Sequence, residues 1–520
     1  MNVTQASSME LAIYAITFAT LISATVRLLF RHRSTIRQIL GPPSPSWIFG
    51  HMLQLRLSRE YGDHEFQWLK QFGSVYRLQG CFGKNQLMVA DPLALQYILN
   101  SPVFGRTGAV NVMVDLVFGK KSVIGAQDNE HRRLRAGLNI GFTATAVRNY
   151  QPVFERVAET IAEELDNHPA ASINISPLLT VATLGAITEA VFRYSLKDLG
   201  EEFVENNFQT VELTATRSEA QLLVDALSDR LPLWLWHAAT YLPTTAFKII
   251  RRGNELADQM GRQIVRERLD AAKQGLKMND DLFSILLDPD VQDHMSGDDV
   301  VAQIRLILLA GQETTANTIA WGLLELAKNP AFQEKLRAEI QDALGTSAGA
   351  VAYDGMPLLN AFIKETIRLY PALPLADRVV LQDTTIPLSD PITTSTGHIN
   401  RIPVLKGQHV TLCIAAYQRL ESRWGADSHD FNPFRWLDGT EFRKEAVGPY
   451  ANLLSFLGGP RTCLGWRFAI VEMQVILSHL VAKFSFAQVE GESILPRYLN
   501  NLLPVVSSGE KAVPLSITRI

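Results

Sequence analysis

A single cysteine near the end of the chain stands in a setting that suits metal ligation. Cys463 lies in the stretch FLGGPRTCLG, residues 456–465, and an apolar segment typical of a helix follows it. The glycines and the proline predict a rigid turn that enters the N-terminus of that helix. Backbone N–H groups and the positive end of the helix dipole would lower the pKa of a thiol there and favour the thiolate, the form that binds metal. A lone cysteine taken in isolation is more often a small core residue, so the residues spaced around Cys463 have to decide between the two interpretations.

A second segment with chemical potential lies in the middle of the chain. The residues AGQETT, 310–315, fall inside a mostly apolar stretch at 296–328 that predicts a long buried helix. Gly311 costs a helix interior about 1 kcal/mol relative to alanine, which indicates that something approaches the backbone closely. The alternative is a glycine kink with a threonine hydroxyl bonded to the preceding helical turn.

Two pairs of polar residues have helical spacing. Glu365 and Arg368 in KETIRLYP lie one turn apart on a predicted helix that ends before Pro371, and His131 and Arg135 in NEHRRLRAGL lie four residues apart. The members of each pair therefore share one face of their helix. Without further context the first pair indicates a solvated ion pair and the second an exposed basic helix face.

Together these segments resemble the cytochrome P-450 family of haem-thiolate monooxygenases, most closely its microsomal members from fungi. Residues 456–465 match F-x-x-G-x-R-x-C-x-G, residues 310–315 are similar to A-G-x-E-T-T, and residues 365–368 match E-x-x-R. The motifs follow the family's order, and the resemblance covers nearly the whole chain from the proline-rich segment to the C-terminus. Two positions depart from the usual pattern, because Phe434 stands where the family usually has glutamate and His131 where many relatives have tryptophan.

The resemblance implies a catalytic centre built on haem b, iron protoporphyrin IX. Cys463 would be the axial ligand of the haem iron, a thiolate that favours O–O cleavage. Thr314 would hydrogen-bond the oxygen that the haem activates, and Glu313 would supply protons through water. Glu365, Arg368 and Arg435 would form a buried charge network that fixes the scaffold of the cysteine loop.

The resemblance also implies which residues surround the cofactor. Arg461, His131 and Arg135, together with Arg378, would face the haem propionates. Phe456 would pack beside the ring, the small residues Ala310 and Gly311 would open a groove for dioxygen and substrate, and the glycines of the cysteine loop would let it pass close under the porphyrin. The implied cofactor-binding residues are His131, Arg135, Ala310, Gly311, Arg378, Phe456, Gly459, Arg461, Cys463 and Gly465.

Composition excludes several other classes of protein. The chain has 520 residues with 49 Lys and Arg against 53 Asp and Glu, a net charge of −4, so no strong field favours a nucleic-acid partner. The three cysteines, Cys81, Cys413 and Cys463, are widely separated, which argues against a disulfide framework or a zinc ribbon. The phosphate-binding Walker loop, the GxSxG elbow, the HExxH helix and the GxGxxG fingerprint do not occur in the sequence.

The N-terminus predicts a membrane anchor. Residues 11–30 form an apolar run interrupted only by Arg27, and a bilayer-spanning helix needs about 20 such residues. Basic residues follow the run, which is the reverse of the order in a cleaved signal peptide and places the body on the cytosolic side of the membrane. We therefore expect a single-pass protein of the endoplasmic reticulum membrane. Its parts would be an anchor with a basic flank at 1–40, a proline-rich hinge at 41–50 and one haem-binding catalytic domain at 51–520.

The hydrophobic pattern of the body predicts mostly helices and a few short strands. Strand-like runs at 74–79 and 85–90 flank a glycine-containing turn and predict a hairpin. The fold implied by the resemblance is mainly α, the triangular cytochrome P-450 prism with small β-sheets. Further strands are expected within 377–389, 401–412 and 484–518, and helices at about 150–168, 176–194, 204–228, 246–275, 296–328, 330–344, 358–370 and 464–483.

The implied function is oxidation of a lipophilic small molecule with O₂ and electrons from NADPH. No flavin domain follows the cysteine helix, so NADPH-cytochrome reductase is the expected partner, with cytochrome b5 as a second electron donor. The segments expected to line the pocket are mainly apolar, and we expect a terpenoid or another specialised metabolite of a fungal pathway. These segments are the loop at 102–124, the region at 204–252, the first half of the helix at 296–328, residues 371–380 and the turn near 498–507. The alternatives are a haem-thiolate isomerase or dehydratase, a sterol, fatty-acid or xenobiotic hydroxylase, and a haem sensor or membrane scaffold without catalysis.

Overall fold

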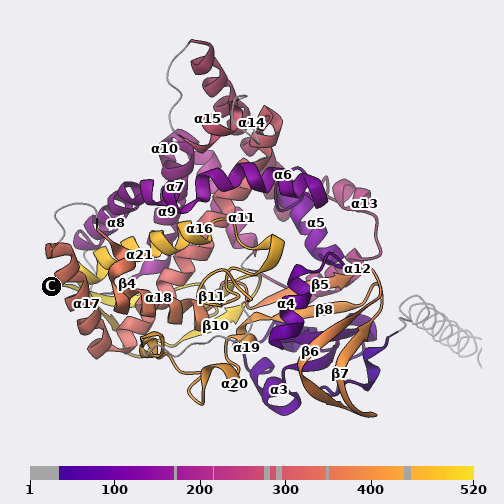
Figure 1. Ribbon diagram of the computed structural model, residues 1–520. Helices are drawn as coiled ribbons and strands as arrows, with labels where there is room; N and C mark the ends of the chain where they lie inside the picture. The colour runs from indigo at the N-terminus through magenta and orange to yellow at the C-terminus, as the bar shows by residue number, and fades with distance from the viewer. Residues whose placement is uncertain are drawn as a thin grey trace, which may run out of the picture.

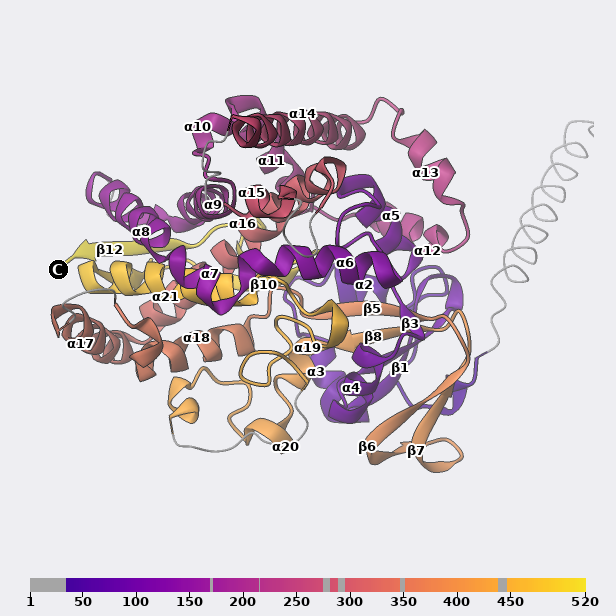
Figure 2. The same ribbon diagram turned by 45° about the horizontal axis from the view of Figure 1, so that its top comes forward.

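Helices make up most of the molecule, and the strands gather on one side of it. The computed structural model describes residues 34–168, 172–214, 216–274, 281–288, 295–346, 351–437 and 447–520. In Figures 1 and 2 the strands β5 to β8 lie with the short helices α3 and α4 on one side, and the long helices α8, α17, α18 and α21 lie on the other. The core follows the same division, with one large hydrophobic cluster among the helices and a second around the main sheet.

The main sheet contains five strands in the order β1-β2-β8-β5-β3. The predicted hairpin is confirmed, because β1 (Val75–Gln79) pairs antiparallel with β2 (Asn85–Val89) around the turn at 80–84. The middle of the sheet is buried, with Leu87, Val410 and Leu412 fully shielded from solvent. The other strands of this sheet are β3 (Phe104–Gly105), β5 (Leu375–Val380) and β8 (His409–Cys413).

Three smaller sheets complete the strand content. The long hairpin of β6 and β7 projects from the strand-rich side in both views, and the other two small sheets involve the C-terminal part of the chain. Their strands are β4 (Ser172–Asn174), β6 (Thr384–Thr394), β7 (Gly397–Val404), β9 (Phe484–Gln488), β10 (Ile494–Tyr498), β11 (Leu502–Val506) and β12 (Pro514–Arg519).

Helix α16 (Gly297–Lys328) is the central element of the helical part. It begins at Ser296, whose side chain forms a capping box with Asp299, and it runs for 32 residues. It packs against α9 (Ile175–Ile187) and α14 (Thr245–Lys273), and most of its residues are buried. A stretch that is apolar on most sides must be enclosed by other elements, which is what the sequence predicted.

The helices that the sequence predicted are present, with one exception. The stretch expected as one helix at 204–228 is two helices, and Ser218 begins the second with a capping box to Gln221. A serine followed three residues later by glutamine is a sequence signal for a helix start that the hydrophobic pattern alone hides. The other helices are α2 (Met52–Arg56), α3 (Glu65–Phe72), α4 (Pro92–Asn100), α5 (Gly108–Val117), α6 (Asp128–Asn139), α7 (Ala144–Asn149), α8 (Gln151–Asp166), α10 (Leu196–Leu199), α11 (Glu201–Thr214), α12 (Glu219–Ser228), α13 (Leu233–Ala239), α15 (Leu282–Leu287), α17 (Pro330–Thr346), α18 (Pro357–Leu369), α19 (Ile414–Tyr417), α20 (Glu421–Trp424) and α21 (Trp466–Lys483).

The segment expected as a hinge is non-helical and packs on the main sheet. Arg77 of β1 donates its backbone N–H to the carbonyl oxygen of Leu40 (2.9 Å), and His51 donates to the carbonyl oxygen of Gln79 (2.7 Å). Ile36 and Ile39 are buried in the cluster around the sheet. The folded body therefore includes residues that precede position 51.

The predicted anchor at 11–30 lies outside the described residues. Within the described part of the chain, one helical stretch, Ile175–Phe192, is long and apolar enough to cross a membrane. Two thirds of it are buried against other helices, which is typical of a core helix.

Candidate functional site

The loop that carries Cys463 has a fixed shape. The N–H of Cys463 donates to the carbonyl oxygen of Phe456 (2.8 Å), which closes the loop, and Gly465 is the N-cap residue of α21. Three non-glycine residues nearby, Ala451, Asn452 and Leu457, have left-handed backbone conformations with φ between 49° and 61°. Such conformations persist only where the surrounding contacts hold them.

Glycine is needed at position 459 for a different reason from the one implied by the family resemblance. Its φ is +66°, and a Cβ at this position would lie 2.4 Å from the backbone oxygen of Leu99 at the end of α4. The glycine is therefore needed where the loop packs against α4. A close approach of the loop to a porphyrin is not required to explain the glycine at this position.

The thiol of Cys463 combines solvent exposure with dense protein surroundings. The side chain is exposed to solvent, yet burial raises the pKa of the thiol above its ordinary value, while the N–H of Gly465 and the charge of Arg135 act in the opposite direction. A side chain with both properties faces an opening inside the fold. The expected N–H donor is present, but the net shift of the pKa is upward, so the expectation of a lowered pKa is wrong for the chain alone.

Four arginines and a histidine gather next to this loop. Burial and repulsion by Arg461 and Arg378 lower the pKa of Arg106 to about 10, and burial with repulsion by Arg461, Arg135 and Arg106 lowers the pKa of His131 to about 4. The pKa values of Arg461, Arg135 and Arg378 are also lowered, first by burial. Among the described residues, none of the four arginines forms an ion pair with a carboxylate.

This cationic cluster fits the acidic edge of a haem. Like charges held together in a partly buried place are unfavourable unless an anion joins them. Asp128 and Asp377 offset the repulsion only in part. The side chain of Arg461 instead donates to the carbonyl oxygen of Ala126 (2.8 Å) and to Oε1 of Gln127 (2.9 Å). Two propionates beside a thiolate ligand would supply the missing negative charge.

Helix α16 presents an open face in the middle of the fold. Ala310 is exposed and Thr314 half-buried, although the residues before and after this helical turn are largely buried. The hydroxyl of Thr314 donates to the carbonyl oxygen of Ala310 (3.0 Å), so the back-bonded geometry weighed at the sequence level is present without a break in the helix. The small side chain of Ala310 thus leaves space against α16, as expected.

Gly311 and Glu313 lie on other faces of this helix. A Cβ on Gly311 would lie 2.8 Å from Ile187 of α9, so helix packing explains the glycine without a bound molecule. The carboxylate of Glu313 forms an ion pair with Lys511 (3.0 Å) and accepts a hydrogen bond from Asn501 (3.0 Å). The carboxylate that was expected to supply protons is therefore held by the C-terminal part of the chain.

The structure brings Glu365, Arg368 and Arg435 together in the core. The guanidinium of Arg368 contacts the carboxylate of Glu365 through two hydrogen bonds of 2.8 Å, and Arg435 donates to the same carboxylate (3.0 Å). Glu365 and Arg368 are fully buried. The N–H groups of Asn432 and of the Trp436 ring give the carboxylate two further hydrogen bonds, which compensates for its burial. Phe434, the departure from the family pattern, lies partly exposed and packs on Phe332.

Gln418 connects this network to the cysteine loop and was missed in the sequence. Its Nε2 donates to the carbonyl oxygens of Arg368 (2.8 Å) and Ile367 (3.1 Å), and its Oε1 accepts from the N–H of Leu454 (2.8 Å). The hydroxyl of Ser455 bonds both Gln418 and Ile367. An isolated glutamine carries no sequence signal. Arg106 of the cationic cluster was not singled out either, but it belongs to a segment already expected near the pocket.

The donor set around the site favours one thiolate ligand over a metal held by side chains alone. Among the described residues, no group of three or more His, Cys, Asp or Glu side chains could hold a metal ion. Cys463 thus stands as a single sulfur donor beside the cationic cluster. A haem-thiolate centre is expected to have this combination of groups.

Comparison with known proteins agrees with this class. The family model described as Cytochrome P-450 matches residues 40–512. Cytochrome P-450 monooxygenase claU of Ampulloclitocybe clavipes is 30% identical over 518 residues, covering 94% of each chain. Cytochrome P-450 monooxygenases 205 and 219 of Postia placenta are 28% and 30% identical, covering 91% and 88% of each chain.

The chain therefore belongs to the cytochrome P-450 family, whose members named here are fungal monooxygenases. Membership implies a haem iron cofactor, a redox partner and a lipophilic substrate.

Proposed function

We propose that this monooxygenase binds haem b through Cys463 and oxidises a lipophilic specialised metabolite, with a terpenoid as the first candidate. The observation that carries the proposal is the placement of one water-accessible cysteine beside five basic side chains that have no carboxylate partner in the described part of the chain. The similarity of the chain to fungal monooxygenases supports a fungal biosynthetic pathway as the setting.

Different residues of the described chain would hold the cofactor and assist proton transfer. When bound, haem supplies the activation of dioxygen and the transfer of one oxygen atom to the substrate. Cys463 would ligate its iron, Arg461 would orient its acidic edge by charge, and His131 would orient it by a hydrogen bond. The hydrogen bond to Ala310 uses only the O–H of Thr314. The lone pairs of this hydroxyl therefore remain free to accept a hydrogen bond from a water molecule that carries a proton. Glu313 can exchange a proton with that region only after its ion pair with Lys511 loosens.

The substrate side of the proposal rests on apolar residues in the segments expected to line the pocket. Ile307 of α16 lies one turn before Ala310, and the strands that we expected to contribute are apolar at Leu375 and Leu502. Apolar walls with few polar groups select a lipophilic ligand. The same argument supports a sterol or fatty-acid hydroxylase as an alternative.

Membrane attachment is part of the proposal. The sequence predicts a span at 11–30, and the described surface supports it, because α13 has no buried residue and exposes Trp234 by 68%. Tyr241 and Leu242 directly after it are exposed by 79% and 53%. Large exposed apolar groups in one segment indicate a membrane or protein contact. The catalytic domain would then face the cytosol at the endoplasmic reticulum and receive electrons from NADPH-cytochrome reductase, with cytochrome b5 as a second donor.

The carbon-monoxide difference spectrum of the reduced protein tests the centre directly. The wild-type protein should show the red-shifted Soret band of a thiolate-ligated haem, and Cys463→Ser should lose it. Arg132→Ser, on the exposed side of α6, serves as a control that should keep the band. A wild-type protein that is folded and haem-loaded but lacks the band would rule out Cys463 as the ligand. Product formation that requires NADPH and reductase would separate a monooxygenase from an isomerase.

A further inference from the structure

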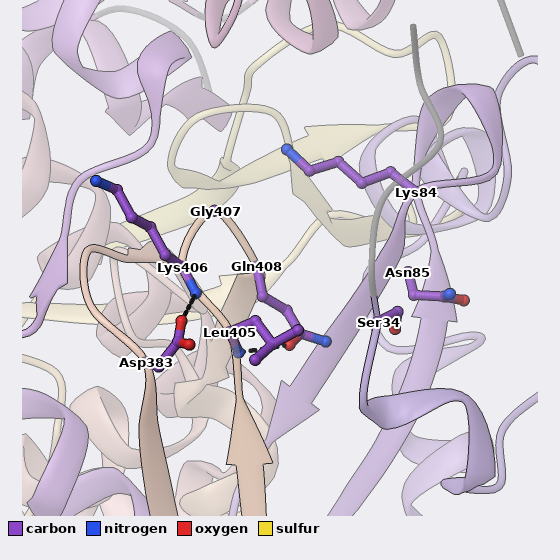
Figure 3. A pocket seen from close by; sticks show the side chains of 8 residues that line it. All are labelled: Ser34, Lys84, Asn85, Asp383, Leu405, Lys406, Gly407 and Gln408. Carbon is purple, nitrogen blue, oxygen red and sulfur yellow. Dashed lines mark hydrogen bonds between the residues drawn. The ribbon is translucent and has the colours of Figure 1, made fainter. Parts of the chain in front are cut away.

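A polar pocket lies at the start of the described chain, on the strand-rich side. Its volume is about 270 Å³, and its walls are three turns of the chain together with Ser34. Figure 3 shows these turns, which lie between β1 and β2, between β5 and β6, and between β7 and β8. The lining residues are Ser34, Lys84, Asn85, Asp383, Leu405, Lys406, Gly407 and Gln408.

Two buried hydrogen-bond donors in this pocket have no partner among the residues that the structure describes. Gln408 is 6% exposed, and neither its Nε2 nor the hydroxyl of Ser34 makes a hydrogen bond. The backbone N–H of Leu405 sets the orientation of the amide, because it donates to Oε1 of Gln408 (3.2 Å). In Figure 3 the amide nitrogen points to the side on which Ser34 and Asn85 lie. An unpartnered buried donor costs about 1–3 kcal/mol, so a ligand with acceptor oxygens would stabilise this arrangement.

The walls of the pocket carry charges of both signs, so they suit a zwitterionic ligand better than a simple anion. The ammonium of Lys84 is already engaged by Asp229 (2.8 Å) and His409 (2.7 Å). Asp383 accepts a hydrogen bond from the backbone N–H of Lys406 (2.7 Å). The exposed ammonium of Lys406 remains as the cation at the rim.

We propose that this pocket binds the phosphodiester of a membrane lipid headgroup. A phosphodiester offers only acceptor oxygens, which matches the two unpartnered donors, and the cationic group of a zwitterionic headgroup such as phosphatidylcholine would suit the carboxylate of Asp383. Ser34 follows directly on the basic flank of the predicted span, so the pocket lies where the chain would leave the membrane at headgroup depth. The assignment rests on the membrane attachment proposed above.

The test uses the full chain in phosphatidylcholine nanodiscs, followed by native mass spectrometry in mild detergent. The wild type should retain one lipid molecule, and Gln408→Glu should lower its occupancy about tenfold, because that change keeps the acceptor for Leu405 but replaces the donor by a negatively charged oxygen. Ser34→Ala should lower the occupancy less. The matched control Gln341→Glu, on exposed α17 at the opposite end of the molecule, should leave it unchanged.

Three outcomes would overturn the proposal. Equal lipid retention by the wild type and both pocket variants would rule out the pocket. Absence of retained lipid from the wild type would rule out the lipid. Protection of the detergent-solubilised wild type against unfolding by inorganic phosphate, without any retained lipid, would assign the pocket to a soluble phosphate instead. The carbon-monoxide spectrum of the same samples keeps this test separate from the haem centre, since its band depends on Cys463 and not on Gln408.

Discussion

Lys511 forms an ion pair of 3.0 Å with Glu313, and so joins the C-terminal part of the chain to the helix that carries Thr314. Both side chains are largely buried, with exposed fractions of 21% and 5%. The carboxylate of Glu313, next to Thr314 in the chain, is thus held by a residue nearly two hundred positions later. Its availability for proton transfer depends on that contact.

Lys511→Met should lower stability and alter coupling, which is the amount of product formed per NADPH consumed. The change leaves the Glu313 carboxylate buried with only Asn501 as a partner, which should lower the free energy of unfolding by about 1–3 kcal/mol. Product formed per NADPH consumed should change as well, because the carboxylate is released from its ion pair. Thermal unfolding and product-to-NADPH ratios measure the two effects, with exposed Lys120→Met as the control. Unchanged coupling in a stable Lys511→Met protein would show that Glu313 does not supply protons.

Gln418→Leu should destabilise the cysteine loop more than the rest of the fold. The variant loses the hydrogen bonds to Arg368 and Leu454 and leaves buried polar groups without partners, at a cost of about 2–4 kcal/mol. We expect a lower melting temperature and a lower haem content per protein. The exposed Gln341→Leu should behave like the wild type in both measurements. Full haem content in Gln418→Leu would contradict the role of this link.

Arg461→Met should weaken haem retention. Removing one cation from the cluster reduces its attraction for two carboxylates, and we expect dissociation of haem to accelerate about tenfold. In the same variant without haem, the pKa of His131 should rise from about 4 towards its ordinary value, since repulsion by Arg461 helps to lower it. Haem transfer to an acceptor protein and a histidine titration by NMR measure these effects. Arg132→Met serves as the control for both, and equal haem retention in the two variants would argue against the cluster as the propionate site.

Glu65 should make stability depend on pH near neutrality. Burial raises the pKa of its carboxyl to about 7, above the 4.5 of an exposed glutamate. The folded state therefore holds a proton that the unfolded state releases, so stability is highest below pH 4.5 for this group and falls as the pH rises towards 7. The loss amounts to about 3 kcal/mol between these limits. Denaturant titrations at pH 5 and pH 8 should show this decrease in the wild type and a smaller one in Glu65→Gln; parallel profiles would exclude Glu65 as its source.

Much of the fold follows from local patterns in the sequence. The hairpin at β1 and β2, the buried α16 and the paired Glu365 and Arg368 all arise from periodicity and turn residues that act over a few positions. The break between α11 and α12 was missed because a capping box interrupts a stretch that stays amphipathic on both sides. Long stretches with regular spacing are thus predictable, and their internal boundaries are less so.

Residue roles were harder to predict where they depend on contacts distant in the sequence. The motifs identified Gly311 and Gly459 correctly as positions that need glycine, but their reasons are contacts with Ile187 and Leu99. The ion pair of Glu313 with Lys511 could not be foreseen, because no periodicity relates the two residues. The pKa of Cys463 likewise reflects burial by the whole fold, which a local helix terminus cannot reveal.

The left-handed residues Ala451, Asn452 and Leu457 have a consequence for how the protein acquires its cofactor. Each occupies a backbone conformation that costs about 1–3 kcal/mol unless neighbours impose it, and protein contacts impose it here. The cysteine loop is thus shaped before anything binds, and little binding energy is spent on ordering it. The cofactor should then bind to a preformed loop. Its binding rate should be set by encounter with the protein rather than by a slow rearrangement of the chain.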